Sequence, residues 1–157
     1  MFMTHSKCVF WMSHNQKQKY IDKFPFLNKH RTQVLSSIFS EQSLNYIASL
    51  DYSKKNNKYL ILNSNSWIKG AIECREYAES NNLEYEMVWN LEYKELLAKL
   101  AESKGIIFLP KGGDTCPRFT IEAKLLGCDL IINENVQHKN EQWFDTRESC
   151  LEYMYSR

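Results

Sequence analysis

Short apolar runs alternate with longer, periodically patterned segments along most of this chain, which is typical of an α/β protein. The expected strands are residues 59–62, 83–90, 106–109 and 130–132, and the expected helices are residues 40–50, 70–82, 93–103, 117–127 and 146–155. The runs at 59–62 and 106–109 are uninterrupted, as in strands that are covered on both faces. Strands that alternate with helices predict a Rossmann-like parallel sheet with helices on both faces, over residues 41–157.

Two of the expected helices show their buried faces in the sequence. In 93–103, Leu96, Leu97 and Leu100 recur at helical spacing between charged residues, so they should face the core. In 70–82, the buried face should carry Ala71, Cys74, Tyr77 and Ala78.

The first forty residues follow a different pattern. Two short strands are expected, at 7–13 and at 33–39, on either side of a polar stretch. That stretch, 14–31, contains Lys17, Lys19, Lys23, Lys29 and Arg31 against a single acid, Asp22. It is consistent with a solvated helix and loop, and alternatively with a surface that meets an acidic partner or anionic headgroups.

The stretch 106–133 predicts a strand, a glycine-rich turn, a short buried helix and a second strand. Gly112 and Gly113 would let the backbone turn tightly or approach a ligand closely. Pro117 fits the first turn of a helix, and Gly127 fits its end. In open parallel sheets, ligands bind at the carboxyl ends of strands, beside helix N-termini that attract anions.

Two carboxylates flank the start of this helix. Asp114 lies in the turn, and Glu122 lies among apolar helix residues. Glu122 could point outward or pair with Arg118, four residues earlier on the same helix face. Alternatively, its side chain leans back toward the helix N-terminus and accepts hydrogen bonds from ligand hydroxyls.

The turn and helix resemble the donor-binding motif of retaining GT-B glycosyltransferases, especially glycosyltransferase family 4. That motif has an acid, seven intervening residues, and a Glu followed by Ala, a helix and a Gly. This chain has Asp114, seven residues, Glu122, Ala123 and then Gly127. The resemblance implies that Glu122 binds the ribose of a nucleotide-sugar. It also implies that Asp114 binds the donor sugar, together with the backbone of Gly113, Thr115 and Cys116.

The resemblance extends to Lys69-Gly70, which follows a strand and a polar turn as the family's diphosphate-binding lysine does. The Arg that commonly precedes that lysine is absent from 63–67, and Arg118 is the candidate to replace its charge. Residues 34–39 resemble the family's interdomain linker and 8–13 the last strand of its amino-terminal domain. Residues 1–40 are therefore expected to be a remnant of that domain, and the acceptor would need a separate domain or a second copy.

Composition limits the partners. A net charge of +1 supplies no global field for nucleic acid. The five cysteines are widely spaced and odd in number, which favours a reducing, cytoplasmic setting. Without a histidine in a suitable context, a catalytic role for the Cys116 thiol is disfavoured. No apolar run is long enough to span a membrane. His138 is expected in a surface loop or, alternatively, at the edge of the donor site.

These observations predict the donor-binding half of a metal-independent glycosyltransferase that transfers a sugar from a nucleotide-sugar to an unknown acceptor. No bound metal or further cofactor is expected, because the resemblance to GT-B enzymes implies that none is needed and the chain has no D-x-D motif. The alternative is a non-catalytic α/β module that binds a nucleotide or a protein partner. A glycosidase that uses Asp114 and Glu122 is disfavoured, because one short βα unit seldom supplies both sides of a sugar cleft.

Overall fold

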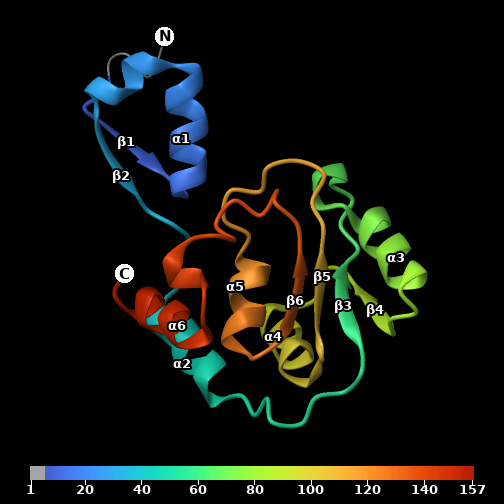
Figure 1. The fold of residues 1–157 in the computed structure, drawn as a ribbon. Helices are drawn as coiled ribbons and strands as arrows, with labels where there is room; N and C mark the ends of the chain where they lie inside the picture. The colour runs from blue at the N-terminus through green and yellow to red at the C-terminus, as the bar shows by residue number, and fades with distance from the viewer. Residues whose placement is uncertain (1–5) are drawn as a thin grey trace.

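The computed structural model describes residues 6–157, which form a small amino-terminal unit and a larger α/β unit (Figure 1). The small unit consists of β1 (Cys8–Trp11), α1 (His14–Lys23), the 3₁₀ helix η2 (Pro25–Lys29) and β2 (Arg31–Val34). Its two strands pair in parallel, with Cys8 opposite Arg31. The expected strand at 33–39 is therefore wrong in its bounds: pairing begins at Arg31 and ends at Val34, and residues 35–40 connect the units.

The larger unit is built on one four-stranded parallel sheet in the order β4-β3-β5-β6. Its strands are β3 (Tyr59–Leu62), β4 (Tyr85–Val88), β5 (Gly105–Phe108) and β6 (Asp129–Ile132). Its helices are α2 (Glu41–Ser49), η3 (Trp67–Lys69), α3 (Ala71–Ser80), α4 (Tyr93–Glu102), α5 (Arg118–Leu125), η4 (Gln142–Phe144) and α6 (Arg147–Tyr155). The α/β class with a parallel sheet flanked by helices, as in Rossmann-like proteins, is confirmed.

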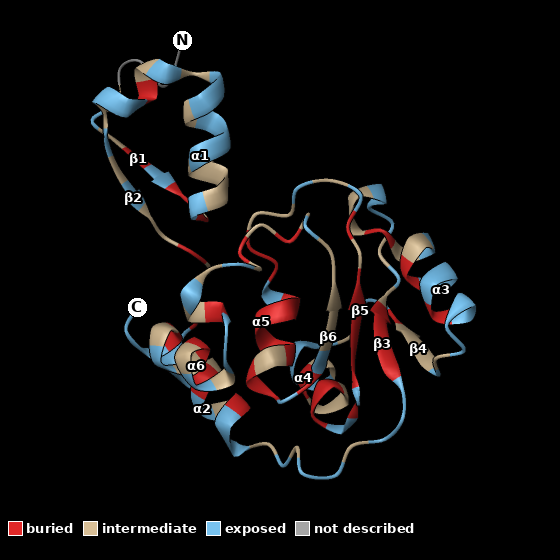
Figure 2. Cartoon of the chain, in the orientation of Figure 1, coloured by how far each residue is buried: buried red, intermediate tan, exposed pale blue. Residues whose placement is uncertain are grey.

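The strand order places a topological switch point between β3 and β5. From β3 the chain moves outward to β4 and then crosses back to β5 on the other side of β3. Alternate side chains of β3 and β5 therefore pack into separate cores. Leu60 and Ile106 lie in the core that includes α4 and α5, whereas Ile61 and Ile107 pack with Cys74 and Ala78 of α3. Figure 2 shows these two central strands as the most continuously buried part of the sheet.

Local sequence signals explain most element boundaries. Ser40 caps α2 by accepting from the backbone N–H of Ser43, and Thr146 caps α6 in the same way through Ser149. Pro117 lies at the N-cap of α5, and Gly127 follows its end with φ of 67°, a left-handed conformation that favours glycine.

One expectation about an individual residue is wrong. Tyr77 is exposed, because the face of α3 that meets the sheet is narrow and is filled by the small side chains of Cys74 and Ala78. Neither Gly112 nor Gly113 has a positive φ, so the turn after β5 does not depend on left-handed glycine conformations. The glycine that does so in this region is Gly70, which lies in the loop after β3.

Candidate functional site

The loops that follow β3 and β5 are packed directly against each other at the carboxyl edge of the sheet. The backbone N–H of Lys111 donates to the carbonyl of Ile68 at 2.8 Å. Gly70 has φ of 67°, and a Cβ atom built there would lie 2.1 Å from the carbonyl oxygen of Leu109. Only glycine therefore allows this close approach. The two loops meet at the switch point, where ligands bind in open parallel sheets.

Lys69 and Asp114 come together across this junction although they are 45 residues apart in the sequence. The Lys69 Nζ atom donates to Asp114 Oδ2 at 2.6 Å, and it also lies 5.7 Å from the centre of the Phe108 ring. The Asp114 side chain is 13% exposed and that of Lys69 is 34% exposed. The structure thus brings together two residues that the sequence had singled out separately, one from each loop.

The turn that carries Asp114 is anchored to the segment after β6. The N–H of Asp114 donates to the carbonyl of Asn135 at 2.7 Å, and the N–H of Gln137 donates to the carbonyl of Asp114 at 3.0 Å. The side-chain amides of Asn133 and Asn135 both donate to the carbonyl of Pro110. These two asparagines hold the turn in place, and the sequence analysis missed them. The sequence did contain a signal for them, since Asn133 directly follows an expected strand and Asn135 lies two residues further on.

Glu122 is buried and pairs with Arg118, the contact expected from their spacing on one helix face. Its side chain is buried, with the whole residue only 3% exposed, and Arg118 Nε lies 3.4 Å from Glu122 Oε1. Glu122 lines a cavity of about 380 Å³ together with Ser43, Tyr93 and Arg118. Burial raises the pKa of the Glu122 carboxyl, and the charge of Arg118 and a hydrogen bond with Tyr93 oppose that rise. It is therefore a carboxyl held inside the protein beside an opening.

Arg118 belongs to the Glu122 side of the site. Its guanidinium lies 4.3 Å from the centre of the Phe39 ring and 5.6 Å from that of Tyr93. Its Nη2 atom also donates to the Tyr93 hydroxyl at 3.3 Å. The predicted residues thus form two separate charged pairs, Lys69 with Asp114 and Arg118 with Glu122. Asp114 is not among the residues that line the Glu122 cavity.

The remaining predicted residues shape the turn between these pairs. Gly113 lies against the side chain of Gln137. Thr115 is half-buried, and Cys116 is buried. Ser37 contacts Cys116 twice, through its N–H to Sγ at 3.4 Å and through its hydroxyl to the carbonyl at 3.0 Å. Burial raises the pKa of the Cys116 thiol, so this group is protonated near neutral pH and is a poor nucleophile.

His138 is fully buried, so its expected place in a surface loop is wrong. Its ring stacks on Trp143 and meets Phe144 edge-on, because η4 folds back over it. The Nε2 atom lies 3.1 Å from Thr120 Oγ1, and Nδ1 has no hydrogen-bond partner. Burial, with a smaller effect from Lys124, lowers the pKa of His138 to about 4. A neutral imidazole therefore packs against α5 beneath the site.

A larger cavity of about 620 Å³ lies where the small unit meets the segment after β6. Its lining residues are His14, Asn15, Gln137, Asn140, Glu141, Gln142, Trp143 and Tyr153. At its edge, His14 Nδ1 lies 2.6 Å from Glu141 Oε2, and the His14 N–H donates to Glu141 Oε1. Four of the eight side chains around this cavity are amides. Sequence reasoning missed them, because none belongs to a recognisable motif.

Comparisons with models of known protein families, with curated proteins and with solved structures found no match for this chain. Across residues 6–157, His, Cys, Asp and Glu side chains nowhere gather in groups of three or more that could hold a metal ion. Within the same range, no helix has both the length and the apolar character needed to cross a lipid bilayer.

Proposed function

We propose that this chain is the nucleotide-sugar-binding half of a retaining GT-B glycosyltransferase. The observation that carries the proposal is the Lys69–Asp114 contact of 2.6 Å at the switch point of the sheet. Both residues occupy positions that the resemblance assigns to the donor, and they come from different loops. Contact between them supports a single binding place for the diphosphate and the sugar.

The Lys69–Asp114 pair has a direct chemical use in this proposal. Without donor, the Asp114 carboxylate neutralises the ammonium of Lys69. A diphosphate carries more negative charge than one carboxylate, so on binding it would become the main partner of Lys69 and free Asp114 for the sugar hydroxyls. Because the nucleoside diphosphate leaves during glycosyl transfer, a cation beside it stabilises the charge that grows in the transition state.

Glu122 would accept hydrogen bonds from the two ribose hydroxyls of the nucleotide. Its burial supports this role, because a desolvated carboxylate forms stronger hydrogen bonds than one in water. The charge of Arg118 favours the ionised form of Glu122 and the ion pair holds its side chain in place, while the Phe39 and Tyr93 rings fix the guanidinium. In this arrangement Arg118 positions Glu122 and does not bind the diphosphate, which departs from the sequence-based assignment.

Nucleotide binding by matched lysine variants tests the proposal. Lys69→Met removes the ammonium from the switch point, and Lys99→Met removes one from a surface pair with Glu86. Both pairs are 2.6 Å long, and the two lysine side chains are 34% and 33% exposed. Charge-assisted hydrogen bonds contribute about 1.5–3 kcal/mol. Calorimetric titration with UDP, GDP and ADP should therefore show about 10- to 100-fold weaker binding by Lys69→Met and unchanged binding by Lys99→Met.

Glu122→Gln should weaken binding of the same nucleotide. It should leave binding of 2′,3′-dideoxy nucleotides nearly unchanged, because those ligands lack the ribose hydroxyls. Failure of all three diphosphates to bind at millimolar concentration would refute the donor site. Equal losses in Lys69→Met and Lys99→Met would refute the assignment of Lys69.

A non-catalytic nucleotide-binding or protein-interaction module is the second candidate. It is favoured by the pairing of each cation of the site with a carboxylate, which leaves no uncompensated positive charge for a phosphate. Mass spectrometry separates the two functions. Transfer of a sugar to any acceptor, or slow hydrolysis of the bound nucleotide-sugar, would refute the passive module.

A further inference from the structure

Positive charge is concentrated in the small amino-terminal unit. Residues 6–34 contain six cations, Lys7, Lys17, Lys19, Lys23, Lys29 and Arg31, and one acid, Asp22. The net charge of this segment is +5, whereas residues 35–157, with 14 cations and 18 acids, carry −4. The overall charge of +1 therefore hides a strongly basic unit joined to an acidic one. This segregation matters because surface charge acts over about one Debye length, roughly 8–10 Å, and not over the whole molecule.

These six cations are not used to hold the fold together. None of the ion pairs formed among residues 6–157 involves any of them. Asp22, the one acid within residues 6–34, accepts a hydrogen bond from Gln18 instead. Six cations without an ion-pair partner on so small a unit repel one another.

A row of aromatic rings runs along α1 and η2 among these cations. Successive ring centres are 5.4 Å apart from Trp11 to Tyr20, 6.4 Å to Phe24, 6.2 Å to Phe26 and 6.4 Å to His30. Trp11 is buried, Tyr20 is exposed, and the other three are half-buried. The ammonium of Lys23 lies 5.7 Å from the centre of the Phe24 ring.

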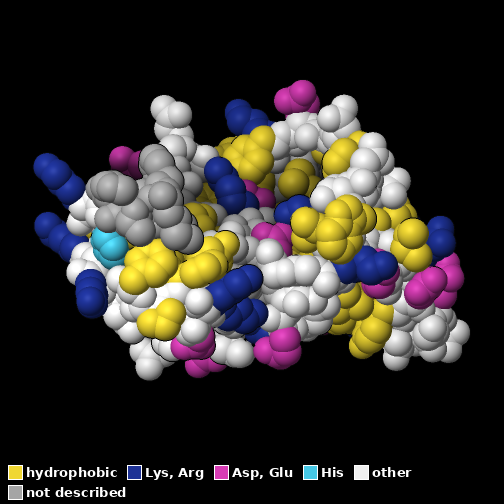
Figure 3. Space-filling view, turned by 90° about the horizontal axis from the view of Figure 1, so that it is seen from above, with side chains coloured by type: hydrophobic (Ala, Val, Ile, Leu, Met, Phe, Trp, Pro, Cys, Tyr) yellow, Lys and Arg dark blue, Asp and Glu magenta, His cyan; other side chains and the backbone are white. Residues whose placement is uncertain are grey.

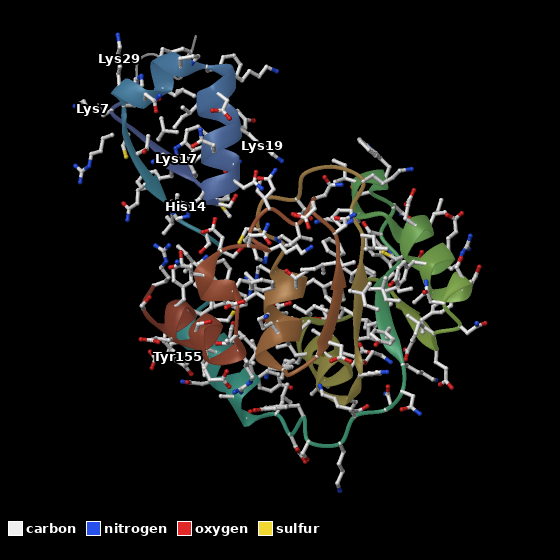
Figure 4. All side chains as sticks on the ribbon, viewed as in Figure 1. Lys7, His14, Lys17, Lys19, Lys29 and Tyr155 are labelled. Atoms are coloured by element: carbon white, nitrogen blue, oxygen red, sulfur yellow. The ribbon has the colours of Figure 1, made fainter. Side chains whose placement is uncertain are left out.

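The outer end of the small unit presents both features on one face. Lys7 precedes β1, Lys29 ends η2 just before β2, and Arg31 is the first residue of β2, so these three cations share the amino edge of the two strands. Figure 4 shows Lys7 and Lys29 at this outer end, with His14 at the end that faces the larger unit. Viewed from above, in Figure 3, hydrophobic side chains gather at this end beside a histidine, with Lys and Arg side chains around them.

The packing of the rings indicates which polyanion this face fits. Single-stranded nucleic acid binds by stacking bases on open ring faces. Here neighbouring rings are inclined to one another by 46°, 41°, 58° and 78°, so they do not form a series of parallel faces on which successive bases could stack. Ring edges and methylene stems surrounded by ammonium groups are instead suited to a lipid headgroup layer, where the apolar parts enter and the cations stay with the phosphates.

We propose that the outer face of the small unit, formed by Lys7, Lys23, Lys29 and Arg31 around Tyr20, Phe24 and Phe26, binds the surface of an anionic lipid bilayer. The face lies at the opposite end of the unit from His14 and the cavity that it lines. Membrane attachment would therefore leave the cavity and the switch point of the larger unit accessible. The proposal does not depend on the bound nucleotide or on sugar transfer.

Vesicle co-sedimentation tests this proposal. We expect the chain to bind phosphatidylcholine vesicles that contain phosphatidylglycerol, and to bind pure phosphatidylcholine vesicles much less. Raising the salt concentration should release it, because the Debye length shortens. Replacing Lys7, Lys23 and Lys29 together by Gln should weaken binding about 100-fold, since each cation near an anionic surface contributes roughly a fivefold factor.

The matched control replaces Lys54, Lys58 and Lys104 by Gln, which removes the same charge from exposed positions on the larger unit. This control should bind as the parent does. For the aromatic contribution, Tyr20→Ser should weaken binding, whereas Phe10→Ser should not, because Phe10 is exposed on the uncovered face of the two-stranded sheet. Circular dichroism verifies that each variant is folded.

The proposal would be overturned if the chain bound neutral and anionic vesicles equally or bound neither. It would also be overturned if the two triple variants lost vesicle affinity to the same extent. So would an RNA oligonucleotide that binds more tightly than the vesicles with the same dependence on Lys7, Lys23 and Lys29. That result would make the face a nucleic-acid surface.

Discussion

The junction of the two loops at the switch point depends on glycine at position 70. An alanine there would have to adopt φ near 67°, which costs about 1–2 kcal/mol for a residue with a Cβ atom. Its Cβ would also lie 2.1 Å from the Leu109 carbonyl oxygen and 2.9 Å from the carbonyl carbon. Both are backbone atoms at the end of β5, so the overlap is relieved only if the loops move apart. Overpacking of this kind costs about 1–3 kcal/mol.

Gly70→Ala should therefore lower the free energy of unfolding by about 3 kcal/mol, measured by urea denaturation followed by circular dichroism. For a chain of this size that corresponds to a fall in Tm of roughly 6–12 °C. The substitution should also weaken nucleotide binding, because separating the loops lengthens the 2.6 Å contact between Lys69 and Asp114.

Gly112→Ala is the matched control in the neighbouring loop. A Cβ atom there would meet only Ile68 Cγ2, at 3.9 Å, and φ is not positive. This variant should be within about 0.5 kcal/mol of the parent, or more stable by about 0.4–1 kcal/mol because the unfolded chain loses freedom. If Gly70→Ala were as stable as Gly112→Ala, the close packing of the two loops would be refuted.

Two buried groups should give opposite pH dependences of stability. Between pH 6.5 and about 4, the unfolded chain binds a proton at His138 that the folded protein excludes. Acidification over this range should therefore lower the free energy of unfolding by up to about 3 kcal/mol. In His138→Phe this decrease should be smaller. Burial raises the pKa of Glu122 above its ordinary value of 4.5, so the folded protein holds that proton more tightly and loses stability as pH rises through this region. Glu122→Gln should remove that loss and make acid denaturation steeper. Urea titrations at several pH values measure both slopes.

The slope of the free energy of unfolding against pH distinguishes the loss of a titrating group from a packing defect, because a packing defect lowers stability equally at every pH. If His138→Phe kept the slope of the parent between pH 6.5 and 4, the neutral buried imidazole would be ruled out. An unchanged slope in Glu122→Gln would likewise show that Glu122 does not titrate abnormally.

Regular elements were predictable where short-range patterns decide them. The bounds of β3 agree with the apolar run at 59–62, and α4 begins at Tyr93 as its leucine spacing indicates. The start of α6 follows from Thr146 and the helical periodicity behind it. In these cases a few neighbouring residues fix the backbone, through periodic burial or through a cap, so no distant contact is needed.

The candidate site was predictable only in part. The sequence singled out Lys69, Asp114 and Glu122 by spacing, but their partners depend on how the strands are ordered. Because β3 and β5 are neighbours, Lys69 meets Asp114. Arg118 instead turns toward Phe39 and Tyr93, since the connecting segment and α4 lie on that side of α5.

What the sequence alone determined is the alternation of strands and helices, the end of α5 shortly before Gly127, and the position of the polar loops at the carboxyl edge of the sheet. Only the tertiary structure decided that His138 is buried, that Tyr77 is exposed and that Gly70 is the glycine whose conformation is required. The physical reason is the range of the interactions. Periodicity and capping act within about one turn of a helix or along one strand, whereas burial and close approach are fixed by segments that are distant in the sequence.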